Sequence, residues 1–144
     1  MGEFQGILPI DEHVIFIDFD RDLGTKPDAR LKLMNLYNVL IYGEENITKC
    51  IKKTISSTIS SKIQLLYSGT GKKIKGVGKL NFSEINIFKC LRDATQEKFG
   101  DSDQMKNFIT RTSVFLANAG DRDGRRKIRA AKSANQHSNN EQIN

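Results

Sequence analysis

The stretch SEINIFKCLRDATQEKFG, residues 83–100, decides the fold class because its apolar side chains recur every three or four residues. Such spacing places them on one face of an α-helix, with polar residues on the other. Ser83 is expected to cap the start of this helix, and Gly100 to end it. The predicted inner face consists of Ile85, Phe88, Leu91, Thr95 and Phe99.

The next segment, DSDQMKNFITRTSVFLANAG at 101–120, has the same periodicity and predicts a second helix. Asp101 or Asp103 is expected to cap its start, and Gly120 to end it. Its predicted inner face consists of Met105, Phe108, Ile109, Thr112, Phe115, Leu116 and Ala119. Two consecutive amphipathic helices favour an all-helical domain.

Three more helices are expected upstream. Asp11 is placed to cap the first, which Gly24 would end, although Ile15, Ile17 and Phe19 also alternate like a strand. Pro27 begins the second, which ends at Gly43. Their predicted inner faces are Ile15, Phe16, Phe19 and Leu23, and then Leu31, Met34, Tyr37, Leu40 and Ile41. The third has its apolar face at Ile47, Cys50, Ile51, Ile55 and Ile59.

These segments together predict an all-α fold, a compact bundle of five or six helices with one glycine- and lysine-rich loop. A short helix or turn is expected over residues 62–67. We expect one helical domain over residues 8–125 and a basic, then polar and disordered, tail over 126–144. The predicted core contains Phe16, Phe19, Leu31, Tyr37, Ile51, Ile55, Leu66, Phe82, Phe88, Leu91, Phe108 and Phe115.

Cellular location is inferred from the cysteines and the apolar runs. Cys50 and Cys90 each fall on an apolar helical face, so we expect reduced core thiols in a reducing compartment, with a disulfide as the alternative. No run of about 18 apolar residues occurs, and the start MGEFQGILPIDEH lacks the pattern of a signal peptide. These features predict an intracellular protein that neither spans nor enters a membrane.

The net charge of +6 is unevenly distributed along the chain. Residues 1–43 carry four Lys/Arg against seven Asp/Glu, a balance of −3, whereas residues 44–132 carry nineteen against nine, a balance of +10. A positive field of this kind attracts polyanions. An ordinary solvated surface is the alternative reading.

Three basic elements are the predicted nucleic-acid contacts. One is the polar face of the helix at 47–59, the second is the loop SGTGKKIKGVGK at 68–79, and the third is a cluster near the C-terminus. A glycine-rich loop lets backbone N–H groups and ammonium groups approach phosphates together. A flexible surface loop without a ligand is the alternative. The candidate residues are Lys49, Lys52, Lys53, Lys72, Lys73, Lys75, Lys79, Arg122, Arg125, Arg126, Lys127 and Arg129.

Enzymatic readings have less support. The loop is not a Walker motif, because neither Gly71-Lys72 nor Gly78-Lys79 is followed by Ser or Thr. VIFIDFDRDLGT at 14–25 resembles the first motif of haloacid-dehalogenase-type phosphatases, a resemblance that implies Asp18 as nucleophile and Asp20 as acid beside Mg²⁺. The lack of further apolar strands counts against a parallel sheet. We therefore expect no enzymatic activity, cofactor or metal, and His13 and His137 have no ligand spacing to a cysteine.

The order of these features resembles domain-of-unknown-function family 4806, an invertebrate C-terminal domain sometimes associated with transposons. The likeness lies in LPI at 8–10, ITKCIKKTIS at 47–56, YSGTGKK at 67–73, KLNF at 79–82, INIFKCLRDA at 85–94 and FLANAGDR at 115–122. The tryptophans usual in that family are absent here, where Gly69 and Phe115 stand instead. A looser similarity to the helical BEN domain implies DNA contacts from the loop and the basic C-terminal end.

The leading hypothesis is therefore nuclear DNA binding, related to transcription or to a transposon, with RNA left open. A protein-interaction module that forms a homodimer or docks on an acidic protein is the second hypothesis. The Mg²⁺-dependent phosphatase that would use Asp18 and Asp20 is the third.

Overall fold

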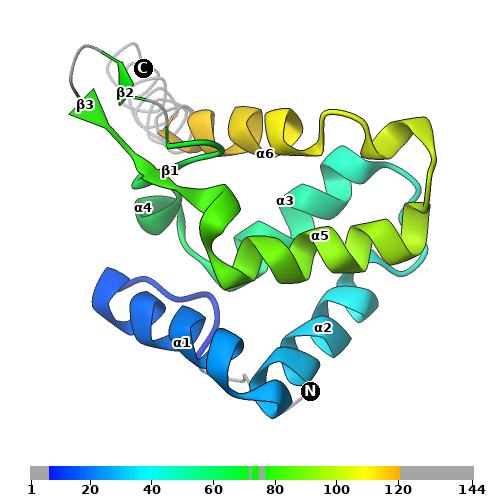
Figure 1. Cartoon of the computed structure of the whole chain (residues 1–144), viewed down its shortest axis with the longest axis horizontal. Coiled ribbons are helices and arrows are strands. Elements are labelled where there is room, and N and C mark those ends of the chain that lie inside the picture. The colour runs from blue at the N-terminus through cyan, green and yellow to red at the C-terminus, as the bar shows by residue number, and fades with distance from the viewer. Residues whose placement is uncertain (1–6, 72, 75–76, 121–144) are drawn as a thin grey trace, which may run out of the picture.

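The computed structural model describes residues 7–71, 73–74 and 77–120 of the 144-residue chain, and this part is mainly helical. Figure 1 shows a compact arrangement of helices with a small β element at one side. The described α-helices are α1 (His13–Thr25), α2 (Pro27–Ile41), α3 (Ile47–Thr58), α4 (Ser61–Gln64), α5 (Asn86–Phe99) and α6 (Phe108–Ala117). The predicted all-α fold class is confirmed. The expected tail at 126–144 lies outside the described residues.

The helices enclose one core. α2 packs against α1, α3 and α5, and α3 packs in turn against α5 and α6. In Figure 1, α6 lies above α3 and α5, while α1 and α2 lie below them. An ion pair between Arg30 and Asp93 links α2 to α5 at the surface. The stack places α6 at one side of the molecule, with one face toward solvent.

Short strands join α4 to α5. β1 (Tyr67–Ser68) pairs in parallel with β4 (Leu80–Asn81), so that Tyr67 lies opposite Leu80. Between them, β2 (Lys73–Ile74) and β3 (Val77–Gly78) form an antiparallel pair with Ile74 opposite Val77. The glycine- and lysine-rich segment is thus a short hairpin, one of the two conformations expected for it. Two 3₁₀ helices, η2 (Phe82–Glu84) and η3 (Asp103–Met105), precede α5 and α6.

The apolar face of α3 is fully buried in the core. Its predicted inner residues Ile47, Cys50, Ile51 and Ile55 are buried, and so is Ile59, which follows the helix. Isoleucines and threonines are weak helix formers, so packing rather than intrinsic propensity stabilises α3. The side chain of Asn46 accepts the backbone N–H of Lys49 and caps the helix.

Aromatic rings continue the core from α1 to α5. Phe16 meets Tyr67, Tyr67 meets Phe82, and Phe82 meets Phe88, each pair edge to face with centroids 5.8 to 6.0 Å apart. The predicted core is confirmed for Phe16, Tyr37, Ile51, Ile55, Phe82, Phe88, Leu91, Phe108 and Phe115. Phe19 is partly buried.

Four residues predicted to face the interior are instead exposed, Ile15 by 55%, Leu31 by 59%, Leu66 by 41% and Ile109 by 42%. On α2 the side turned inward carries Leu33, which is fully buried, in place of Leu31. Cys50 and Cys90 are buried free thiols, as the sequence indicated.

Several predicted helix ends are also wrong. The residue before α1 is Glu12 rather than Asp11, it makes no side-chain cap, and the helix continues past Gly24 to Thr25. Ser83 lies within η2 instead of capping α5. By contrast, the short helix or turn predicted over 62–67 is confirmed, as α4 over Ser61–Gln64 and a turn at 65–66 before β1 begins at Tyr67.

The predicted aspartate cap of the last helix is wrong as well. Asp103 begins η3, and α6 starts only after Asn107, which has a left-handed backbone with φ of 60°. Asn is among the residues that adopt this conformation most readily. The chain therefore turns sharply before α6. The predicted end of α5 at Gly100 is confirmed, with φ of 57°.

Candidate nucleic-acid interface

The lysine-rich hairpin rises from a base closed by backbone hydrogen bonds. The Leu80 N–H donates to the Leu66 carbonyl at 2.9 Å, and the Ser83 N–H donates to the Gly69 carbonyl at 3.2 Å. Within the base, the Gly71 N–H donates to the Ser68 hydroxyl at 2.7 Å. Both ends of the hairpin are therefore held side by side.

This base is fixed on α6 through a close approach that only glycine permits. A Cβ atom at Gly69 would lie 1.6 Å from the Ser113 hydroxyl oxygen and 3.1 Å from the Ile109 carbonyl oxygen. Gly71 has φ of +70° and lies against Asn81, so a side chain there is also disfavoured. Gly69 thus seats the base of the hairpin directly on α6, and Gly71 lets the chain pass close to β4.

The hairpin and α3 belong to one basic segment. Residues 46–83 contain eight lysines and no acidic residue. Among the predicted contacts of the hairpin, Lys79 is exposed just before β4, and Lys73 begins β2. Lys72 and Lys75 lie outside the described residues. A charge of one sign concentrated in one segment is the arrangement expected for contact with phosphates.

The α3 lysines do not all present a free charge. Lys49, Lys52 and Lys53 are exposed, as predicted, but the Lys53 ammonium lies 3.1 Å from the Glu44 carboxylate. The hydrogen bond from Lys53 holds the pKa of Glu44 below its ordinary value. Lys53 is therefore partly neutralised, whereas Lys49 and Lys52 form no ion pair with another described residue.

The structure adds a cation that the sequence analysis missed. Arg111 of α6 donates from Nη1 to the Thr48 hydroxyl at 3.2 Å and from Nε to the Lys106 carbonyl at 3.4 Å. These bonds hold the guanidinium beside the first turn of α3. The signal in sequence is that no acidic residue occurs between Asp103 and Asp121, so Arg111 lies in an acid-free helix.

The predicted basic elements are not merged into one cluster in the described part of the chain. The hairpin extends past the C-terminal end of α6, whereas Lys49 and Lys52 belong to the first half of α3 (Figure 1). The predicted terminal contacts Arg122, Arg125, Arg126, Lys127 and Arg129 lie outside the described residues. The hairpin base and α3 both pack against α6, which therefore connects them.

The two carboxylates of the phosphatase hypothesis have separate structural partners. Residues 13–25 form helix α1, not the strand that the motif requires. Asp18 is exposed and pairs with Arg21 at 3.1 Å, while Asp20 accepts the backbone N–H groups of Asn86 and Ile87. Burial raises the pKa of Asp20 above its ordinary value despite these hydrogen bonds. The pair is therefore not directed at a common metal.

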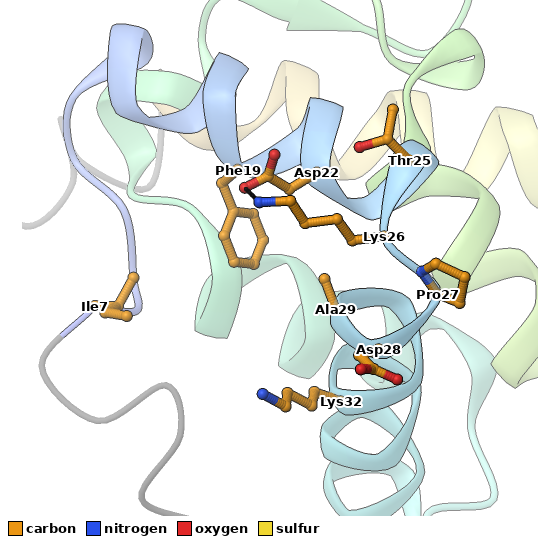
Figure 2. Close-up of a pocket in the computed structure, with 9 residues that line it drawn as sticks. All are labelled: Ile7, Phe19, Asp22, Thr25, Lys26, Pro27, Asp28, Ala29 and Lys32. Atoms are coloured by element: carbon orange, nitrogen blue, oxygen red, sulfur yellow. Dashed lines mark hydrogen bonds and ion pairs between the residues drawn. The ribbon is translucent and has the colours of Figure 1, made fainter.

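A groove between α1 and the start of α2 has a volume of about 530 Å³. Figure 2 shows Phe19 and Ala29 along it, with the Lys26 ammonium turned toward the Asp22 carboxylate, 3.4 Å away. Its lining mixes acids, lysines and apolar groups, and holds no histidine or cysteine. Within the described ranges, no group of three or more His, Cys, Asp or Glu is placed to hold a metal ion.

Comparisons with models of protein families, with curated proteins and with solved structures each found no match to this chain. The resemblance to domain-of-unknown-function family 4806 and to the BEN domain stays a prediction. Among the helices of the described residues, none has the length and apolar character needed to cross a lipid bilayer.

Proposed function

We propose that this domain binds nucleic acid, with DNA as the first candidate, through the lysines of the hairpin and the basic cluster at 122–129. The observation that carries the proposal is a four-lysine hairpin in an acid-free segment, whose base is seated on α6 by Gly69. Backbone hydrogen bonds and the contact of Gly69 with α6 give the described base of the hairpin a defined position on the protein.

Phosphate contacts of this kind position a protein on its ligand without selecting a sequence. Each neutralised phosphate releases counterions, so binding weakens as salt increases. The proposed role is therefore general DNA binding in the nucleus, in a transcription- or transposon-related protein, rather than catalysis.

The test replaces Lys72, Lys73 and Lys75 with Ala and measures affinity for a fluorescent duplex at several salt concentrations. The slope of log affinity against log salt should fall by about 3, roughly 0.9 for each phosphate that the variant no longer neutralises. A matched control replaces the exposed lysines Lys26, Lys89 and Lys98, which lie on other elements, and should leave that slope nearly unchanged. Equal slopes for the two triple variants would reject the proposal.

A protein-interaction or dimerisation module is the second candidate. Two apolar residues at the end of α2, Val39 and Tyr42, are 58% and 88% exposed and line a shallow pocket with Asn38. Large exposed apolar side chains placed together are typical of protein contacts. Light scattering of the wild-type protein and of a Tyr42→Ser variant, without nucleic acid, tests this alternative. A monomer in both samples over a wide concentration range argues against dimerisation.

A further inference from the structure

The exposed face of α6 lies between two basic elements. Ile109 and Ser113, which are four residues apart and share one edge of the helix, meet Gly69 at the base of the hairpin. Arg111 lies on the other edge, where it meets Thr48 of α3. The side chains that face outward between the two edges are Thr110, Val114 and Ala117, all of them exposed.

On the α3 side, Lys52 is an exposed positive charge. Thr48 and Lys52 are four residues apart and share an edge of α3, and Thr48 is the residue that contacts Arg111. Lys53 lies toward the opposite edge, where it pairs with Glu44. Lys52 and Arg111 therefore form the basic border of α6 on this side, and the base of the hairpin, with the exposed Lys79, forms the other border.

The surface between these borders is uncharged and free of acids. No acidic residue occurs from 104 to 120, so nothing on α6 would repel a phosphate backbone. Thr110 and Ala117 are small, and Val114 is 56% exposed, which leaves room for close approach. A polyanion that touched both borders would have to cross this face.

The chemistry of the face favours a duplex over a single strand. Proteins that bind single strands stack the bases on exposed aromatic rings. Here Phe108 and Phe115 of α6 and Tyr67 of β1 are buried, and α3 contains no aromatic residue. Without a stacking surface, the available contacts are those that lysine, arginine and hydroxyl groups make to the sugar-phosphate backbone.

Resting on the proposed function, we infer that a nucleic-acid duplex lies across the outward face of α6, between the base of the hairpin with Lys79 on one side and Lys52 with Arg111 on the other. The inference adds a second set of backbone contacts to those of the hairpin. It also makes α6 the part of the protein nearest to a groove of the duplex, so residues 110, 114 and 117 face the nucleic acid.

A single negative charge on this face tests the inference. Thr110→Glu should weaken duplex affinity roughly tenfold or more at about 50 mM salt, and the loss should shrink as salt screens the new charge. The matched control is Asn35→Glu, an exposed position on α2, which lies on the other side of α5 from α6 in Figure 1. This variant should bind within about twofold of wild type, and circular dichroism should show that both variants keep the wild-type helix content.

Lys52→Ala and Arg111→Gln give a second readout, since each should lower the salt slope by about 1. If Thr110→Glu binds like wild type while the hairpin triple variant loses affinity, the inference is wrong and the proposed function stands. If the wild-type protein binds no duplex, both are wrong. Equal wild-type affinity for a single strand and a duplex of the same sequence would also overturn the assignment of a duplex.

Discussion

Asp20 of α1 caps helix α5 at Asn86, 66 residues further along the chain, where its Oδ2 accepts the Asn86 backbone N–H at 3.0 Å. Its Oδ1 accepts the next N–H, from Ile87, at 2.8 Å, and the Asn86 side chain returns a hydrogen bond to the Asp20 carbonyl at 2.8 Å. Helix starts leave N–H groups unpaired and favour negative charge. A carboxylate that in sequence resembles a catalytic acid is therefore a structural cap that joins two helices.

Replacing Asp20 with Ala should lower the free energy of unfolding by about 1–3 kcal/mol at neutral pH, because two N–H groups lose their acceptor. Asp20→Asn should cost less, since its amide oxygen still accepts one of these bonds. Urea denaturation followed by circular dichroism measures both. The control is Asp18→Asn on the exposed face of α1, which should change the free energy by no more than about 0.5 kcal/mol. Equal losses for Ala at position 20 and Asn at position 18 would show that Asp20 is not a cap.

Gly69→Ala should destabilise the protein by about 1–3 kcal/mol, since the added methyl group overlaps the side chain of Ser113. Thermal or urea unfolding measures the loss. The cause is tested by a double-mutant cycle with Ser113→Gly, which removes the overlapping atoms but leaves the Ile109 carbonyl 3.1 Å away. The double variant should be more stable than the sum of the single effects predicts. Purely additive effects would mean that the contact between the hairpin base and α6 is not the cause.

The buried thiol of Cys90 should make stability fall in alkaline solution. Burial raises the pKa of Cys90 to about 11 from an ordinary value of 9.0. The folded state therefore keeps a proton that the unfolded chain releases. The contribution of the Cys90 thiol to the free energy of unfolding is complete below pH 9 and is lost as the pH rises from 9 to 11. Burial also raises the pKa of Tyr67 to about 12, which extends the decline.

Urea denaturation of the wild-type protein and of Cys90→Ala across this pH range separates the contribution of Cys90 from that of Tyr67. The difference in unfolding free energy between the two proteins should shrink as the pH rises, because the Ala variant lacks the thiol but keeps Tyr67. A difference that stays constant from pH 9 to 11 would contradict the raised pKa of Cys90.

Tyr37→Phe should cost about 1 kcal/mol, the usual net value of one buried hydrogen bond. The Tyr37 hydroxyl lies 2.6 Å from that of Thr58 inside the core, and Thr58 also donates to the Thr54 carbonyl at 2.7 Å. Thr58 would therefore keep one partner, which limits the loss. Tyr42→Phe is the matched control at an exposed tyrosine and should be neutral in the same chemical denaturation experiment. Losses of equal size at both positions would contradict the role of the buried bond.

The helices were predictable where a repeating apolar pattern coincided with burial. Every position expected on the inner face of α3 is buried, because the period of a helix alone decides which side chains share a face. The pattern was weaker on α2, where several apolar residues lie around the helix, and only its neighbours α1, α3 and α5 select Leu33 over Leu31. Amphipathicity identifies a helix more reliably than it orients one.

The candidate interface was predictable only in its charges. The count of lysines identified the hairpin and α3, whereas Arg111 and the role of α6 between them depend on contacts such as Arg111 to Thr48, 63 residues apart. No local pattern contains such a pair. In the sequence, Gly69 is likewise an ordinary loop residue. Its close approach to Ser113 depends on the packing of β1 against α6.

The helical fold class, most of the core and the uneven charge could be predicted from the sequence, because they follow from periodicity and composition along a continuous segment. The capping of α5 by Asp20 and the contact between Arg111 and Thr48 could not. A helix cap and a contact between two helices are made by groups distant in the chain, and their partners come together only after the helices have packed.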